Sequence, residues 1–83
     1  MTENKKDACE RAEEILNMEN PPKLALAYAK KLTEKSGYCA EALLTAFAQY
    51  AQIEEGLPCE DDLYLASDER RELFASVKAS LTD

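Results

Sequence analysis

Apolar positions along the chain recur mostly three and four residues apart, and turn-forming residues separate the periodic segments. The chain holds only two glycines and three prolines, and none of them lies inside a periodic segment. β-branched residues are scarce, and no stretch alternates apolar and polar positions over the length of a strand. The pattern therefore predicts helices joined by short turns.

The first predicted helix runs from about residue 2 or 3 to residue 18. Its apolar positions form one stripe, at Ala8, Ala12, Ile15 and Leu16. Its acidic positions cover the opposite side, at Glu10, Glu13 and Glu14. This arrangement is typical of a helix that packs on a core through one face.

The second predicted helix spans about residues 21–36. Asn20 is a favourable N-cap, and Pro21 suits the first helical position, where its missing N–H costs nothing. Gly37 is expected to end the helix in a left-handed conformation. The inner stripe of this helix contains Leu24, Ala27, Tyr28 and Leu32.

The third predicted helix, at about residues 38–55, differs from the others. Its first sixteen residues read YCAEALLTAFAQYAQI and are the most apolar stretch of the chain. A helix that is apolar nearly all round is a buried helix, so this one is expected to lie at the centre. Gly56 is expected to end it, and Pro58 to prevent an immediate restart.

The last part of the chain allows two interpretations. The apolar spacing after Cys59 fits one long helix, whereas Ser67 followed by two acids resembles the start of a new one. We prefer a short helix at about residues 60–66, a break near Ser67 and a final helix at about 68–81. The inner face of that final helix is expected to contain Leu73, Phe74, Val77 and Leu81.

These segments predict an all-α fold in which residues 1–83 form a single domain. We expect a compact orthogonal or irregular bundle of four helices, with a fifth short turn as an alternative. The core is expected to contain Ile15, Leu16, Leu24, Tyr28, Leu32, Leu43, Leu44, Phe47, Tyr50, Leu73, Phe74 and Val77.

The charge balance narrows the classes of partner. The chain carries 10 basic and 17 acidic residues, for a formal net charge of −7. Direct binding of nucleic acid usually needs a basic surface, and anionic membranes attract basic segments. We therefore expect no direct nucleic acid and no membrane, and the three cysteines, which form no disulfide framework, favour a cytoplasmic location. A small core is often supplemented by self-association, so a homodimer stays an open alternative.

Candidate chemistry is sparse. The chain has no histidine, which excludes Ser-His and Cys-His pairs, and its glycines are too few for a phosphate-binding loop. Cys9, Cys39 and Cys59 lack the spacing of a zinc site, and the acids near Gly56 lack the spacing of an EF-hand. We expect reduced, partly buried thiols, with one disulfide and a free thiol as the alternative. The sequence thus predicts no enzyme, no metal and no cofactor.

The strongest surface signal is acidic. Between Lys35 and Arg70 the chain has no basic residue and eight acids. The candidate partner-binding residues are Glu54, Glu55, Glu60, Asp61, Asp62, Tyr64, Asp68 and Glu69. Such a band would speed docking onto a basic surface, and a residual apolar helix face with Tyr38 or Tyr50 would add contact area.

Three functions of different classes follow. The leading hypothesis is a non-enzymatic protein–protein interaction or regulatory module that uses this acidic surface, a residual apolar helix face, or both. A more specific alternative is an acidic inhibitor that blocks the basic nucleic-acid-binding site of a partner protein, as some phage-encoded inhibitors do. A small enzyme or metal-binding protein is the third and least favoured.

Overall fold

The computed structural model describes residues 7–36 and 40–82. These residues form α1 (Ala8–Leu16), α2 (Lys23–Ser36), α3 (Ala40–Glu54), the 3₁₀ turn η1 (Asp62–Tyr64) and α4 (Asp68–Thr82). No strand occurs in this part of the chain. The predicted small all-α bundle is confirmed.

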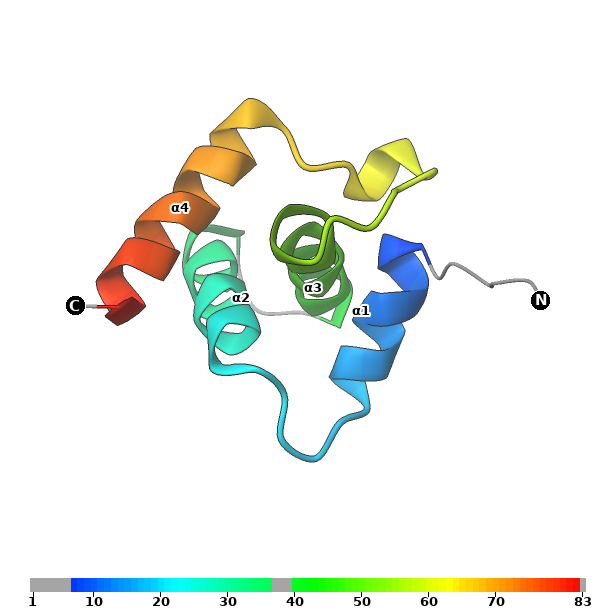
Figure 1. Cartoon of the computed structure of the whole chain (residues 1–83), viewed down its shortest axis with the longest axis horizontal. Coiled ribbons are helices and arrows are strands. Elements are labelled where there is room, and N and C mark those ends of the chain that lie inside the picture. The colour runs from blue at the N-terminus through cyan, green and yellow to red at the C-terminus, as the bar shows by residue number, and fades with distance from the viewer. Residues whose placement is uncertain (1–6, 37–39, 83) are drawn as a thin grey trace.

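α3 lies at the centre of the bundle (Figure 1). α1 packs on one side of α3 and α2 on another, while α4 packs against α2 and touches α3. α1 and α4 therefore lie on opposite flanks, and η1 lies alongside α3 on the α1 side. The predicted central position of this helix is confirmed.

Composition explains why α3 occupies that position. Every residue from Ala46 to Gln52 is buried, a stretch of nearly two turns that covers all sides of the helix. Ala46, Ala48 and Ala51 are small, so they allow neighbouring helices to approach closely. Phe47 and Tyr50 fill the space between the helices. The helix is thus enclosed by its neighbours.

Three aromatic rings join α2, α3 and α4. Phe74 meets the ring of Tyr28 edge-on, with centroids 5.3 Å apart, and the ring of Tyr50 at 6.0 Å. The Tyr28 hydroxyl donates a 2.6 Å hydrogen bond to Oε1 of buried Gln49. The predicted core residues that the structure confirms as buried are Ile15, Tyr28, Leu32, Phe47, Tyr50, Phe74 and Val77.

The other residues predicted to lie inside the bundle are only half-buried or are exposed. Four leucines are only half-buried, although they pack against the core: Leu24, Leu43, Leu44 and Leu73. Leu16 is 42% exposed, so its predicted core position is wrong, and Leu81 is 49% exposed, so its predicted place on the inner face of the last helix is wrong. Leu16 is the last residue of α1, where the helix ends before any neighbour covers it. Leu81 lies in the last turn of α4 and only lines a shallow hollow against α2.

The helix starts also differ from the predictions. Asp7 is extended, and its carboxylate accepts from Glu10 N at 2.9 Å, so Asp7 is the N-cap of α1 and the helix cannot pass through it. The predicted start near residue 2 or 3 lies outside the described residues. α2 begins at Lys23, because the carbonyl of Pro22 accepts the first helical bond, from Leu26 N at 3.1 Å. The predicted Asn20 cap is wrong.

The ends of α3 and the start of α4 follow the sequence more closely. Gly56 has a positive φ of 70°, and Leu57 N donates to Ala51 O at 3.1 Å, which closes α3 as predicted. Gly37, the predicted end of α2, lies outside the described residues. Ser67 Oγ accepts from Arg70 N at 3.2 Å and caps α4, which confirms the break. The predicted short helix at 60–66 is wrong in extent, because only the single 3₁₀ turn η1 forms there.

Candidate interaction surface

Two of the acids predicted to bind a partner lie at the end of α3 and form ion pairs with other helices. Glu55 accepts two hydrogen bonds from Arg11 of α1, from Nε at 2.8 Å and from Nη2 at 3.0 Å. Glu54 accepts one from Lys78 of α4 at 2.9 Å. The Glu55 carboxylate raises the pKa of the Arg11 guanidinium. These acids therefore fasten α3 to its neighbours, and their charges are largely compensated.

Residues 57–66, called here the acidic turn, are positioned by Gln52. This buried side chain donates to Tyr64 O at 2.6 Å and accepts from Ala66 N at 2.9 Å. A glutamine amide can do both at once because it carries a donor and an acceptor group. One side chain of the central helix thus fixes the end of the acidic turn.

The other end of the acidic turn is attached to α1. The backbone N–H of Ala8 donates to Pro58 O at 2.8 Å. Within the turn, Asp61 Oδ1 accepts from Leu63 N at 3.0 Å and caps η1. The turn therefore has a defined shape and two points of attachment, one on α3 and one on α1.

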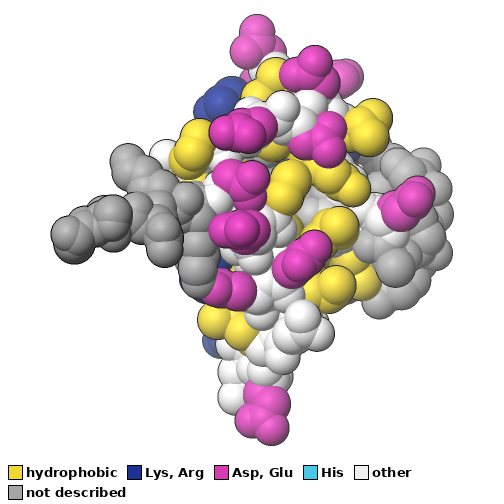
Figure 2. Space-filling model, turned by 90° about the vertical axis from the view of Figure 1, so that its right-hand side faces the viewer, with side chains coloured by type: hydrophobic (Ala, Val, Ile, Leu, Met, Phe, Trp, Pro, Cys, Tyr) yellow, Lys and Arg dark blue, Asp and Glu magenta, His cyan; other side chains and the backbone are white. Residues whose placement is uncertain are grey.

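Exposed carboxylates from α1 and the acidic turn lie on one side of the molecule, called here the acidic face. Figure 2 looks onto that side and shows Asp and Glu side chains along it with apolar side chains between them. Arg11 offers this face little neutralisation, because its hydrogen bonds go to Glu55 and Glu14. The residues of the acidic face are Glu10, Glu13, Glu60, Asp61 and Asp62.

Two leucines of the acidic turn point into solvent. Leu63 is 79% exposed and Leu65 is 51% exposed. Leu63 lines one side of a shallow hollow of about 180 Å³, together with Tyr64 and, from α3, Glu41 and Thr45. A hollow of this size is below the range of about 300–1,000 Å³ that small-molecule sites occupy. Leu63 would lie on the inner stripe only if the chain after Cys59 formed one long helix, and the short η1 turn does not place it there.

The remaining predicted contact residues lie elsewhere or are less accessible. Asp68 and Glu69 are exposed in the first turn of α4, apart from α1. Tyr64 is half-buried. Tyr50 is buried beside Phe74, so its suggested part in an interface is wrong, and Tyr38 lies outside the described residues.

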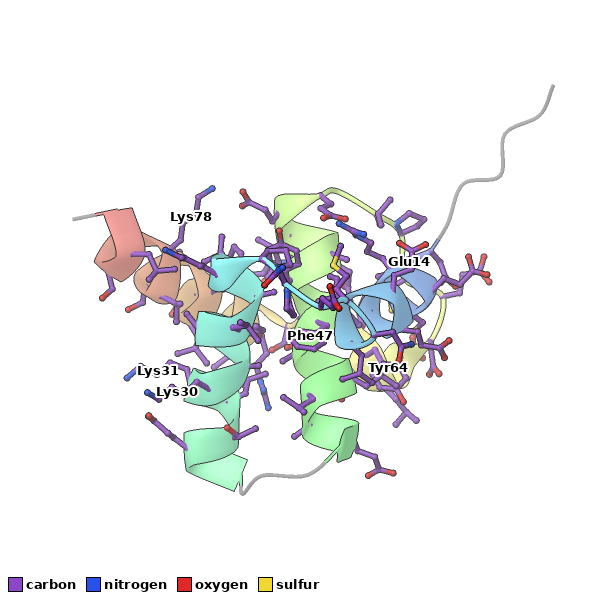
Figure 3. All side chains as sticks on the ribbon, turned by 90° about the horizontal axis from the view of Figure 1, so that it is seen from below. Glu14, Lys30, Lys31, Phe47, Tyr64 and Lys78 are labelled. Carbon is purple, nitrogen blue, oxygen red and sulfur yellow. The ribbon has the colours of Figure 1, made fainter. Side chains whose placement is uncertain are left out.

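The opposite flank has a different character. Lys30 and Lys31 project from α2 on the side away from α1 (Figure 3). They edge a hollow of about 230 Å³ between α2 and α4, whose apolar lining comes from Ala27, Val77 and Leu81. Glu34 lines the same hollow and lies 3.8 Å from Lys31, so this flank carries charges of both signs, whereas the exposed charges of the acidic face are carboxylates.

The described residues contain no group of three or more Cys, Asp or Glu side chains placed to hold a metal ion. None of the described helices has the length and apolar character required to cross a bilayer. The expected absence of enzymatic activity, the expected cytoplasmic location and the expected partner stay predictions.

Comparison of the chain with known proteins identified no related family, protein or structure. Family models, curated proteins and solved structures were all searched, and none matches this chain.

Proposed function

We propose that the chain is a non-enzymatic interaction module that docks its acidic face, together with Leu63, onto a basic surface of another protein. The observation that carries the proposal is the 79% exposure of Leu63 on a turn held in place by buried Gln52. A large apolar side chain placed in solvent by a well-anchored turn has no role in this chain's own core.

The energetics suit a protein partner. Full burial of a leucine side chain contributes roughly 1.5–3 kcal/mol, which makes Leu63 a suitable apolar anchor. The surrounding carboxylates would accelerate the encounter with a basic partner and fix its orientation. Because Glu60 and Asp62 have no ion-pair partner among the described residues, their charges remain available to it.

Anchoring of the turn also favours binding. A loop that is already ordered loses less conformational entropy when a partner binds it. The hydrogen bonds of Gln52 and the Asp61 cap supply that order before any contact is made.

Affinity capture with matched variants tests the proposal. Tagged wild-type chain, Leu63→Ser and Leu26→Ser would each be incubated with lysate of the source cells at low and at high salt. Leu26 is the control because it is 46% exposed but lies on α2. We expect a protein that wild type and Leu26→Ser retain at low salt and that Leu63→Ser loses. Equal retention by Leu63→Ser would exclude Leu63 as an anchor.

Charge reversal tests the electrostatic part with the purified partner. Glu60→Lys combined with Asp62→Lys should weaken binding at least tenfold and flatten its salt dependence. The same charge change on α4, Glu69→Lys with Glu72→Lys, should have a small effect. The opposite order would move the docking surface to α4.

The inhibitor hypothesis is a special case of this proposal. It requires a partner whose basic site binds nucleic acid. Competition between the chain and nucleic acid for that partner would support it, and simultaneous binding of both would contradict it.

A further inference from the structure

Two cysteines that are distant in sequence meet beneath the acidic face. Cys9 lies in the first turn of α1 and Cys59 in the acidic turn, and both are half-buried with free thiols. The residues immediately before them, Ala8 and Pro58, are joined by the 2.8 Å backbone hydrogen bond. Cys59 is near enough to Cys9 to raise the pKa of its thiol, and Cys59 Sγ itself donates to Asp61 O at 3.2 Å.

We propose that Cys9 and Cys59 form an intramolecular disulfide when the folded chain meets a small-molecule disulfide, and that this bond ties α1 to the acidic turn. The backbone bond between Ala8 and Pro58 holds the two segments that carry the cysteines side by side, and a disulfide requires such proximity. The inference is independent of the proposed function, because it concerns only what these two side chains can do.

The reaction is ordinary thiol–disulfide exchange. The Cys59 thiolate attacks one sulfur of the small disulfide, forms a mixed disulfide and releases one small thiol. The Cys9 thiolate then attacks Cys59 Sγ, forms the Cys9–Cys59 bond and displaces the second small thiol. The protein loses two protons and two electrons, and the small disulfide is reduced to two thiols.

The surroundings of Cys9 determine how fast the second step runs. Burial, followed by the neighbouring Cys59 and Asp7, raises the pKa of the Cys9 thiol to about 11 in the reduced chain, and Asp61 adds to this effect. In the mixed disulfide Cys59 carries no charge, so burial, Asp7 and Asp61 are the causes that still raise the pKa of Cys9. Thiolate is the reacting form, so ring closure should be slow at neutral pH and should accelerate as the pH rises. A charge-neutral disulfide reagent is the appropriate probe, because the acidic face would repel an anionic one.

The bond should stabilise the chain. It would close a loop of roughly fifty residues, which restricts the unfolded state strongly. For a chain of this size the expected rise in Tm is on the order of 10–20 °C, reversed by a reducing agent.

Cys39→Ser provides the test, since it leaves only the proposed pair. The variant would be incubated in native buffer at mildly alkaline pH with hydroxyethyl disulfide, a charge-neutral reagent, and analysed by intact mass and free-thiol titration. We expect a monomer that is lighter by two hydrogens, has no free thiol, keeps its helical circular dichroism and melts at higher temperature.

Two further variants serve as controls. Cys9→Ser and Cys59→Ser, each in the Cys39→Ser background, should give only a mixed disulfide with the reagent and no rise in Tm. If Cys39→Ser itself accumulates two mixed disulfides, forms covalent dimers or closes the bond only in denaturant, the proposal is overturned.

Discussion

Replacement of Gln52 by Met tests how the central helix positions the acidic turn. Met has nearly the length of Gln and fills similar space, but it cannot donate to Tyr64 O or accept from Ala66 N. Both bonds are short in the wild-type chain, at 2.6 Å and 2.9 Å, and the residue that donates one of them, Ala66, is buried. The variant therefore removes both bonds to the acidic turn, and a longer one of 3.3 Å to Ala48 O within α3, without creating a cavity.

The expected cost follows from the groups left behind. A buried backbone group that loses its partner costs about 1–3 kcal/mol. Here the N–H of Ala66 is buried and the carbonyl of Tyr64 is partly buried. The acidic turn can relieve part of this cost by detaching locally and exposing both groups to water. We therefore expect a loss of roughly 2–4 kcal/mol, a large share of the 5–15 kcal/mol typical of a folded domain.

Urea unfolding followed by far-UV circular dichroism measures this loss, and hydrogen exchange at the Ala66 amide locates it. Ile53→Met is the matched control, because Ile53 is a half-buried neighbour on α3 that only packs against the core. Conservative apolar exchange there should cost less than about 1.5 kcal/mol. If Gln52→Met matches that control in stability and in Ala66 protection, Gln52 does not hold the turn.

Three further predictions concern stability and follow from the contacts of Phe47, Arg11 and Tyr28. Phe47→Ala empties part of the core and should lower the free energy of unfolding by about 3–5 kcal/mol in a urea titration, and an unchanged midpoint would remove Phe47 from the core. Arg11→Ala breaks the partly exposed pair with Glu55 and should cost only about 0–1 kcal/mol, less at high salt, so a loss above about 3 kcal/mol would show a different role for Arg11. Burial raises the pKa of Tyr28 to about 12, partly offset by Arg70, so the unfolded chain ionises first and stability should fall as the pH rises from about 10 to 12. In Tyr28→Phe that fall should shrink, and an equally steep fall would assign it to other groups.

Local chemistry made much of the fold predictable. The all-round apolar character of α3 identifies the central helix, and the Ser67 cap and Gly56 identify ends that the structure confirms. These signals act within one or two turns of the chain, so they can be seen without knowledge of the neighbours. The predicted start of α2 failed because the helix begins at Lys23, after both prolines, where the carbonyl of Pro22 accepts the first helical bond.

The surface was harder to predict because it depends on contacts between distant residues. Arg11 and Glu55 are separated by 44 positions, and nothing in the sequence pairs them in advance. Glu54 and Glu55 therefore belonged to a predicted acidic band that the structure divides between paired and exposed acids. Gln52 gave no separate signal, since a glutamine in a helix is ordinarily solvated.

The exposure of Leu63 could not be predicted from the sequence either. The spacing of Leu63 fits the inner stripe of a long helix, and only the tertiary contacts of the acidic turn reveal its 79% exposure. The acids of α1 join the acidic face for the same reason, because the Ala8–Pro58 bond brings α1 and the turn together.

Hydrogen exchange of the chain with and without its purified partner tests most directly where docking occurs. The proposed function predicts slower exchange on binding in α1 and in residues 57–66, with little change in the outer turns of α2. Slower exchange confined to the hollow between α2 and α4, with the acidic turn unaffected, would contradict it.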